Sequence, residues 1–170
     1  MECLGFTGHR EYPRPEGRPS WRQRWLDLAF FHYAVEPEVI APTLPEGVEL
    51  DLFEGRAWFS VVPFRMEDVM LRGLPAVPGV SNFPELNLRT YVVRDGKPGI
   101  WVYSLAADQR LAVWAARTFF HLPYLKADMK CEADGDGVIY ESVRRGDGTT
   151  FRGRYWPEGE VYYSEVGSLE

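Results

Sequence analysis

Cysteine and histidine are scarce in this chain of 170 residues. The two cysteines, Cys3 and Cys131, stand in no redox or metal-binding spacing, which argues against a disulfide framework or a zinc knuckle. The three histidines have no acidic or cysteine partner at the spacing of metal ligands. The sequence also lacks a Walker loop, a dinucleotide fingerprint and a Gly-x-Ser-x-Gly motif. We therefore predict no bound metal and no other cofactor.

Long apolar runs are lacking as well. The longest ones fall well short of the roughly 20 residues that a membrane-spanning helix needs, and the first ten residues contain no secretory signal. Acidic residues outnumber basic ones by 25 to 19, and the resulting charge of −6 argues against a nucleic-acid partner. These features predict a soluble, cytoplasmic protein that binds neither nucleic acid nor membrane.

Apolar and aromatic residues are plentiful. They make up 45% and 15% of the chain, enough for one domain with a real core. Large rings also line small-molecule pockets and contacts between subunits. Residues 1–20 hold Pro13, Pro15 and Pro19 among charges, and we expect an extended N-terminal arm there. Residues 21–170 are expected to form a single domain.

Most of this domain is predicted to be β-structure. Alternating or continuous apolar runs with Asp-Gly or Glu-Gly turns predict hairpins over 48–53 and 56–66, over 86–93 and 100–106, and a meander over 124–133, 138–145 and 149–156. Residues 21–35 carry both helical spacing and a β-prone run, and the pattern leaves the choice open. Residues 37–44 suit one or two helical turns.

One segment, residues 110–121, predicts a helix with Asp108 as its N-cap. Its broad apolar face includes Leu111, Ala112, Ala115, Ala116, Phe119 and Phe120. The sequence therefore predicts an α+β protein that is mostly β: a curled or closed antiparallel sheet, barrel-like, crossed by one main helix.

The first candidate site is the row Glu85, Asn87, Arg89 and Tyr91. Strand alternation places all four side chains on one face. If that face lines a barrel, the row can bind a small carboxylate or carbonyl compound, because arginine binds carboxylates bidentately. The alternative is an ordinary solvated face with a cross-strand ion pair.

Two other groups are weaker candidates. Arg117 lies on the polar side of the predicted helix near Trp114 and forms either a cationic wall of a pocket or a solvated helix side. Lys126 and Lys130 share a strand face about 13 Å apart, too far for strong mutual lowering of their pKa values. A solvated face is the favoured interpretation of this strand.

Four segments resemble a known family. They are WLDLAFFHY (25–33), GRAWFSVVPFR (55–65), FPELNLRTY (83–91) and RLAVWAARTFFHLPY (110–124). Together they resemble the YqjF-like family of uncharacterised proteins, from about residue 21 to the end of the chain. That family is related in fold to acetoacetate decarboxylase, whose fold is a conical curled β-barrel with a crossing helix and an internal ligand cavity.

The resemblance implies a cavity without the decarboxylase reaction. The decarboxylase forms a Schiff base on a lysine just after the helix, in a Gly-x-Pro-Lys-Lys type segment. Tyr124 stands where that lysine would be, and tyrosine cannot form an imine. Lys126, two positions on and on the same strand face, is the remaining weak candidate for a reactive amine. The ligand-contacting Glu and Arg of the family would correspond to Glu85 and Arg89.

Members of the family continue past residue 170, so a C-terminal strand or two would be missing here and a sheet edge exposed.

Two functions stay open. The first is a small-molecule-binding barrel acting on a carbonyl or carboxylic compound, with Glu85, Asn87, Arg89 and Arg117 around the ligand and Tyr124 or Lys126 as weak catalytic candidates. The second is a non-catalytic barrel that serves partner binding or self-association, with a homodimer as the expected assembly.

Overall fold

The computed structural model describes residues 16–160, which form nine strands and short helices. The predicted arm lies mainly outside the described residues. The elements in chain order are β1 (Trp21–Leu26), β2 (Phe31–Val35), α1 (Pro37–Ile40), the 3-10 turn η2 (Ala41–Thr43), β3 (Glu49–Leu50), β4 (Ala57–Leu71), β5 (Phe83–Arg94), β6 (Lys97–Ala107), α2 (Arg110–Phe120), β7 (Tyr124–Asp134), β8 (Gly137–Arg144) and β9 (Thr150–Tyr155).

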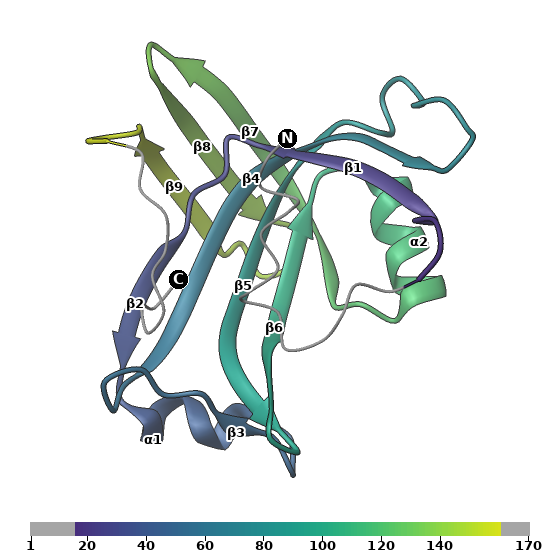
Figure 1. The fold of residues 1–170 in the computed structure, drawn as a ribbon. Coiled ribbons are helices and arrows are strands. Elements are labelled where there is room, and N and C mark those ends of the chain that lie inside the picture. Colours follow the sequence, from purple (N-terminus) through teal and green to yellow (C-terminus); the bar gives the residue numbers. More distant parts are fainter. Residues whose placement is uncertain (1–15, 161–170) are drawn as a thin grey trace.

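The strands form one strongly curved sheet in the order β1-β4-β5-β6-β7-β8-β9 (Figure 1). The strand β2 continues along the same edge of β4 as β1, and β3 pairs with β5. All these pairs are antiparallel except β6 with β7, which is parallel. Parallel neighbours need a crossover connection, and α2 supplies it. The predicted crossing helix is therefore the link between the two halves of the sheet.

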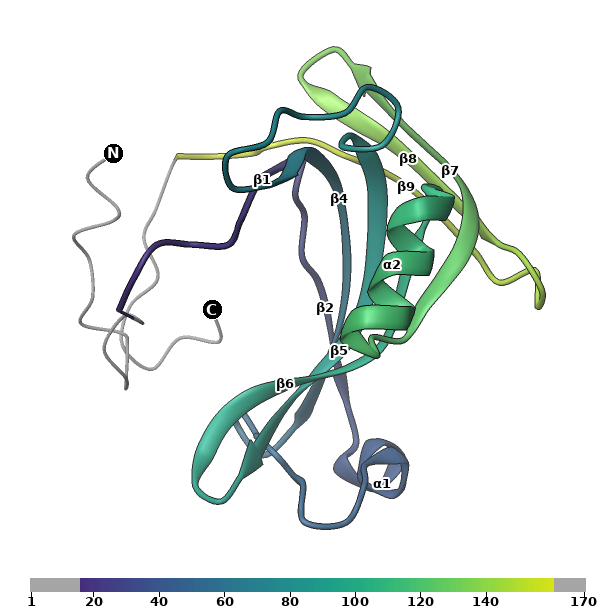
Figure 2. The ribbon, with the colours of Figure 1, turned by 90° about the vertical axis from the view of Figure 1, so that its right-hand side faces the viewer.

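The central strands β4–β6 carry a hydrophobic core on each of their two faces. Val113 of α2 packs on one face, against a buried cluster that includes Val62 and Phe64 of β4. Tyr140 of β8 packs on the opposite face, in a second cluster with Leu86. Figure 2 shows α2 and the β7–β9 meander arranged around the central strands. The strand β4 is apolar on both faces, as predicted, because it lies between these two cores.

The sheet curls but does not close into the predicted barrel. Within residues 16–160, β9 pairs with β8 alone and not with β1 or β2. Side chains link the two ends instead: the ring of Phe31 lies 5.8 Å from that of Tyr155, and the Tyr155 hydroxyl donates to the Asp27 carbonyl at 2.6 Å. The fold is thus mostly-β α+β with an open, curled sheet and only two short helices.

Two local predictions are corrected. The segments 48–53 and 56–66 do not form a hairpin, although Glu54 and Gly55 make the tight turn with positive φ values of 52° and 75°. The reason is that β2 and β5 already occupy both edges of β4, so β3 pairs with β5. The N-cap of α2 is Gln109, whose side chain accepts from the Leu111 amide, instead of Asp108.

The remaining elements agree with the sequence or resolve its ambiguity. Residues 21–35 form two strands, and residues 37–43 form the expected helical turns. The hairpin of β5 with β6 and the meander of β7, β8 and β9 are confirmed. The apolar face of α2 is covered less than its pattern predicts, because Leu111, Phe119 and Phe120 are each more than half exposed.

The close packing of β8 on β9 makes Gly137 sensitive to substitution. A methyl group there would lie 2.6 Å from the carbonyl oxygen of Tyr155 and 3.1 Å from Trp156 Cβ. We expect Gly137→Ala to lower the free energy of unfolding by about 1–3 kcal/mol, because the backbone must shift to make room. Gly99→Ala, where a Cβ meets nothing within 4 Å, is the matched control. Equal urea midpoints for both variants would contradict this packing.

Candidate functional site

The predicted polar row lies on the face of β5 that packs against α2. Pairing with β4 sets Glu85 opposite Phe64, Asn87 opposite Val62 and Arg89 opposite Ser60. Directly paired residues share a face, and Phe64 and Val62 belong to the core cluster beneath α2. Strand alternation was therefore a correct guide to the face. Because the sheet is open, the row does not line a closed barrel.

Glu85 is the one carboxyl of this row, and it is buried. Its side chain is 3% exposed, and one of its oxygens, Oε2, accepts a hydrogen bond of 2.8 Å from the Tyr124 hydroxyl. Burial raises the pKa of Glu85 to about 7, and hydrogen bonds from Tyr124 and Asn87 oppose only part of that rise. Burial and the neighbouring carboxyl also raise the pKa of Tyr124. Glu85 can therefore gain or lose a proton near neutral pH, while Tyr124 stays protonated.

Three buried polar atoms on the same face as Glu85 have no hydrogen-bond partner in the described part of the chain. They are Ser60 Oγ, Asn87 Oδ1 and Arg89 Nε. Ser60 is fully buried and Asn87 is 8% exposed, so neither is readily solvated. A buried polar group without a partner costs about 1–3 kcal/mol, and native proteins rarely leave such groups together. An orphan acceptor and an orphan N–H, two positions apart on one strand, fit a ligand that both donates and accepts.

Aromatic rings cover the far end of the row. The Arg89 guanidinium lies 4.9 Å from the centroid of the Phe30 ring, and the Tyr91 hydroxyl lies 2.7 Å from His32 Nε2. The ring of Trp25 lies 4.7 Å from that of Phe64, beside Glu85. These rings come from the edge formed by β1 and β2. They lower the local polarity around the row, which strengthens hydrogen bonds made there.

A pocket of about 410 Å³ opens next to the Glu85–Tyr124 pair. Its walls come from β1, the ends of β4 and β5, α2 and the start of β7, and they include Trp21, Met66, Phe83, Ala112, Phe120 and Tyr124. The rings of Trp21 and Phe120 meet across it at 6.1 Å. The volume suits a small molecule, and Tyr124 connects this apolar space to the buried carboxyl.

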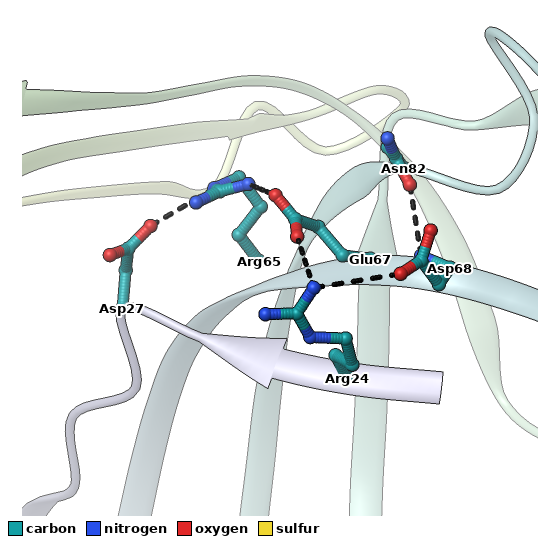
Figure 3. A network of polar contacts seen from close by, with 6 residues as sticks. All are labelled: Arg24, Asp27, Arg65, Glu67, Asp68 and Asn82. Atoms are coloured by element: carbon teal, nitrogen blue, oxygen red, sulfur yellow. Dashed lines mark hydrogen bonds and ion pairs between the residues drawn. The ribbon is translucent and has the colours of Figure 1, made fainter. Parts of the chain in front are cut away.

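Ion pairs hold β1 and the segment after it against β4 (Figure 3). Arg65 joins Asp27 at 3.0 Å and also contacts Glu67, while Arg24 lies 3.7 Å from Glu67 and 3.6 Å from Asp68. The Asn82 side chain accepts from the Asp68 amide at 3.0 Å. These pairs are partly exposed, so each contributes little stability. They lie along the antiparallel pairing of β1 with β4, in the strand that carries Trp21 and Trp25.

The other predicted site residues lie elsewhere. Arg117 is exposed on α2, and Lys126 is exposed on β7; neither is among the residues lining the described pockets. The solvated interpretation fits both. In residues 16–160 no group of three or more His, Cys, Asp or Glu side chains is placed to hold a metal ion. No helix in the same range is long and apolar enough to cross a membrane.

Sequence reasoning missed two residues of this site. Ser60 is a single hydroxyl inside the apolar run 57–64, and that isolated polar residue in a buried strand was a usable signal. Tyr140 is fully buried, and its hydroxyl donates to the carbonyls of Glu85 at 2.8 Å and Phe64 at 3.2 Å. No local pattern marks it, because its partners lie far away in the sequence.

Comparison with known proteins gives family and fold. Residues 22–170 match the family model DUF2071, described as an uncharacterized conserved protein. The chain is 46% identical over 157 residues to the uncharacterized protein YqjF of Bacillus subtilis (strain 168), covering 92% of this chain and 65% of the relative. The chain thus spans slightly less than two thirds of that relative's length.

Solved structures with a similar fold are acetoacetate decarboxylase-like. The decarboxylase of Legionella pneumophila matches with a TM-score of 0.53 and 20% identity, over 78% of this chain and 50% of that one. An acetoacetate decarboxylase-like enzyme of Sphingomonas wittichii RW1 matches with 0.58 and 14%, over 81% and 58%. The enduracididine biosynthesis enzyme MppR, complexed with pyruvate, matches with 0.55 and 15%, over 83% and 57%. Because the sequence identities are this low, the structural likeness establishes the fold and nothing about activity. The chain belongs to the YqjF-like family of uncharacterised conserved proteins, which here has an acetoacetate decarboxylase-like fold.

Proposed function

We propose that this protein binds a small carbonyl or carboxylic compound at the polar face of β5. The observation that carries the proposal is a row of buried polar atoms without partners on the face of β5 that holds Glu85: Asn87 Oδ1 next along the row, and Arg89 Nε and Ser60 Oγ farther on. An oxygen of the ligand would accept from Arg89, and a hydroxyl or enol of the ligand would donate to Asn87. The pyruvate in the complex of MppR belongs to the same chemical class.

Any reaction at this site would use proton transfer in place of imine formation. Tyr124 occupies the position at which the resemblance places the reactive lysine, and its hydroxyl hydrogen-bonds Glu85. A carboxyl with a pKa of about 7 can donate a proton to a ligand carbonyl or take one from an adjacent carbon. Lys126 is exposed and makes a poor candidate for a Schiff base. We therefore assign Glu85 the acid–base role and Tyr124 that of its hydrogen-bond partner.

The test is a calorimetric titration of the chain with pyruvate and with acetoacetate. Arg89→Ala should weaken binding by about 2 kcal/mol, or roughly 30-fold, because a charge-assisted hydrogen bond is lost in a half-buried site. Arg94→Ala, at the 70%-exposed end of the same strand, is the matched control and should bind as the wild type does. Unchanged affinity in Arg89→Ala would remove Arg89 from the site, and no saturable binding by the wild type would end the proposal for these compounds.

Self-association is a second candidate function, favoured by the exposed aromatic face of α2. Leu111, Trp114 and Phe119 are 58%, 57% and 64% exposed, and the last two rings meet edge to face at 5.6 Å. A soluble protein rarely leaves such a patch uncovered, and a second copy of the chain would bury it in a homodimer.

Sedimentation at increasing protein concentration tests the dimer. Trp114→Glu should convert dimer to monomer, because a carboxylate at the centre of an apolar contact is not solvated. Leu52→Glu, at a position 47% exposed on another part of the fold, should leave the mass unchanged. A wild type that stays monomeric at every concentration would contradict self-association.

A further inference from the structure

A second cavity lies on the opposite face of β4–β6, between these strands and the meander. Its volume is about 190 Å³, and it is more enclosed than the pocket beside Tyr124. Val61 and Leu88, which pair across β4 and β5, form its apolar floor, and Phe151 of β9 covers them. Because side chains alternate along β5, Leu86 and Leu88 face this cavity while Glu85 and Asn87 face away from it. The cavity is therefore separate from the site proposed above.

One end of this cavity is polar. Arg144 of β8 lines it, and the side chain of this residue is 19% exposed. Its Nη2 donates to Ser104 Oγ at 3.2 Å, and its Nη1 donates to Asp147 Oδ2 at 3.0 Å. Ser104 is 5% exposed and Ser142, also in the lining, is 2% exposed. A mostly buried guanidinium thus stands at the rim of an apolar space.

The β8–β9 turn holds this arginine in place. The Arg144 amide donates to the Thr149 carbonyl at 2.9 Å, and the Gly148 amide donates to the Arg144 carbonyl at 3.1 Å. Asp147 Oδ1 accepts from the Thr149 amide at 3.0 Å. The turn is therefore ordered by its own hydrogen bonds, which fix the backbone of Arg144, while Ser104 and Asp147 contact its guanidinium.

We propose that this cavity binds a small organic monocarboxylate, with its carboxylate on Arg144 and its apolar body over Val61 and Leu88. Guanidinium groups bind carboxylates through paired N–H donors, and the contacts of Arg144 within the described chain use two of its five. Asp147 is 53% exposed, so its ion pair is weak and yields readily to a ligand.

Size and charge restrict the ligand class. A cavity of about 150 Å³ holds benzene, so 190 Å³ accepts a short branched-chain or single-ring acid. Once Asp147 has released Arg144, one guanidinium balances one negative charge. A dianion such as phosphate would bring a second charge into an apolar cavity, which is strongly unfavourable. The geometry thus favours a monoanion with an apolar tail.

The experiment uses benzoate as the probe, with benzamide as its uncharged counterpart. In methyl-labelled wild-type protein, benzoate should shift the NMR signals of Val61 and Leu88, while those of Met66 and Val69, in the other pocket, stay in place. Benzamide should bind at least about tenfold more weakly, because it carries no charge. Absence of shifts at Val61 and Leu88 would overturn the proposal.

Variants then assign the interaction. Arg144→Gln should weaken benzoate at least about tenfold, and Arg144→Lys should give an intermediate loss, because lysine keeps the charge without the paired donors. Arg152→Gln removes an equal charge from a neighbouring strand at a 68%-exposed position and should bind as the wild type does. Equal losses in both Gln variants would show a general charge effect and refute the site. Unaltered benzoate shifts in Arg89→Ala distinguish this cavity from the site on β5.

Discussion

Replacing Glu85 by glutamine should stabilise the protein relative to the wild type as the pH rises. Between pH 4.5 and pH 8, the difference in the free energy of unfolding should shift by about 3 kcal/mol in favour of the variant. The folded protein holds the Glu85 proton up to about pH 7, whereas an unfolded chain releases it near the ordinary value of 4.5. Between these values the folded state binds more protons, so wild-type stability falls as pH rises. Glutamine has no proton to release and removes this part of the slope.

Urea unfolding from pH 4.5 to pH 8 measures the effect. Glu141→Gln, on β8 with a 42%-exposed side chain, is the control and should follow the wild-type pH profile. If the stability difference between wild type and Glu85→Gln is the same at every pH, the carboxyl has an ordinary pKa and cannot be the acid–base group of the site.

Removal of the Tyr140 side chain should strongly destabilise the protein. Tyr140→Ala should lower the free energy of unfolding by about 3–5 kcal/mol, because a fully buried ring is lost from the second core. Tyr140→Phe keeps the ring and removes only the hydroxyl that bonds the carbonyls of Phe64 and Glu85. It should cost about 1–3 kcal/mol, the penalty for buried acceptors that lose a donor.

The comparison of the two variants separates packing from hydrogen bonding. Tyr103→Phe removes a hydroxyl that contacts Thr43 at an exposed position, and its cost should stay within about 0.5 kcal/mol. Should Tyr140→Phe be as stable as the wild type, the hydroxyl would not pin β8 to the central strands. In Tyr140→Phe we also expect weaker pyruvate binding if Tyr140 fixes the Glu85 backbone, measured by the same titration as for Arg89→Ala.

Much of the fold could be read from the sequence, because the signals are local. Alternation over 85–91 correctly placed four polar side chains on one face, and Asp-Gly pairs marked the turns of the meander. The helix over 110–120 followed from its spacing of apolar residues. Such patterns depend only on residues close together in the chain, which is why they need no knowledge of partners.

Pairing was harder, because each strand edge can be used only once. The Glu54-Gly55 turn is real, yet the strand before it pairs with β5, since β2 occupies the edge of β4 that a hairpin would need. Residues 21–35 likewise became strands instead of a helix because they pair with an edge of β4. Closure of a barrel depends on distances across the whole sheet, and no local pattern reports them.

By itself, the sequence determined the family, the dominance of β-structure and the face on which the Glu85 row lies. Only the tertiary structure decided that Tyr124 and Glu85 meet, that Ser60, Asn87 and Arg89 hold buried atoms without partners, and that Arg117 and Lys126 face solvent. The physical reason is burial. The alternation of side chains determines which face of the sheet each residue of a strand points to. The shifted pKa of a carboxyl, in contrast, arises from the other segments that pack over it.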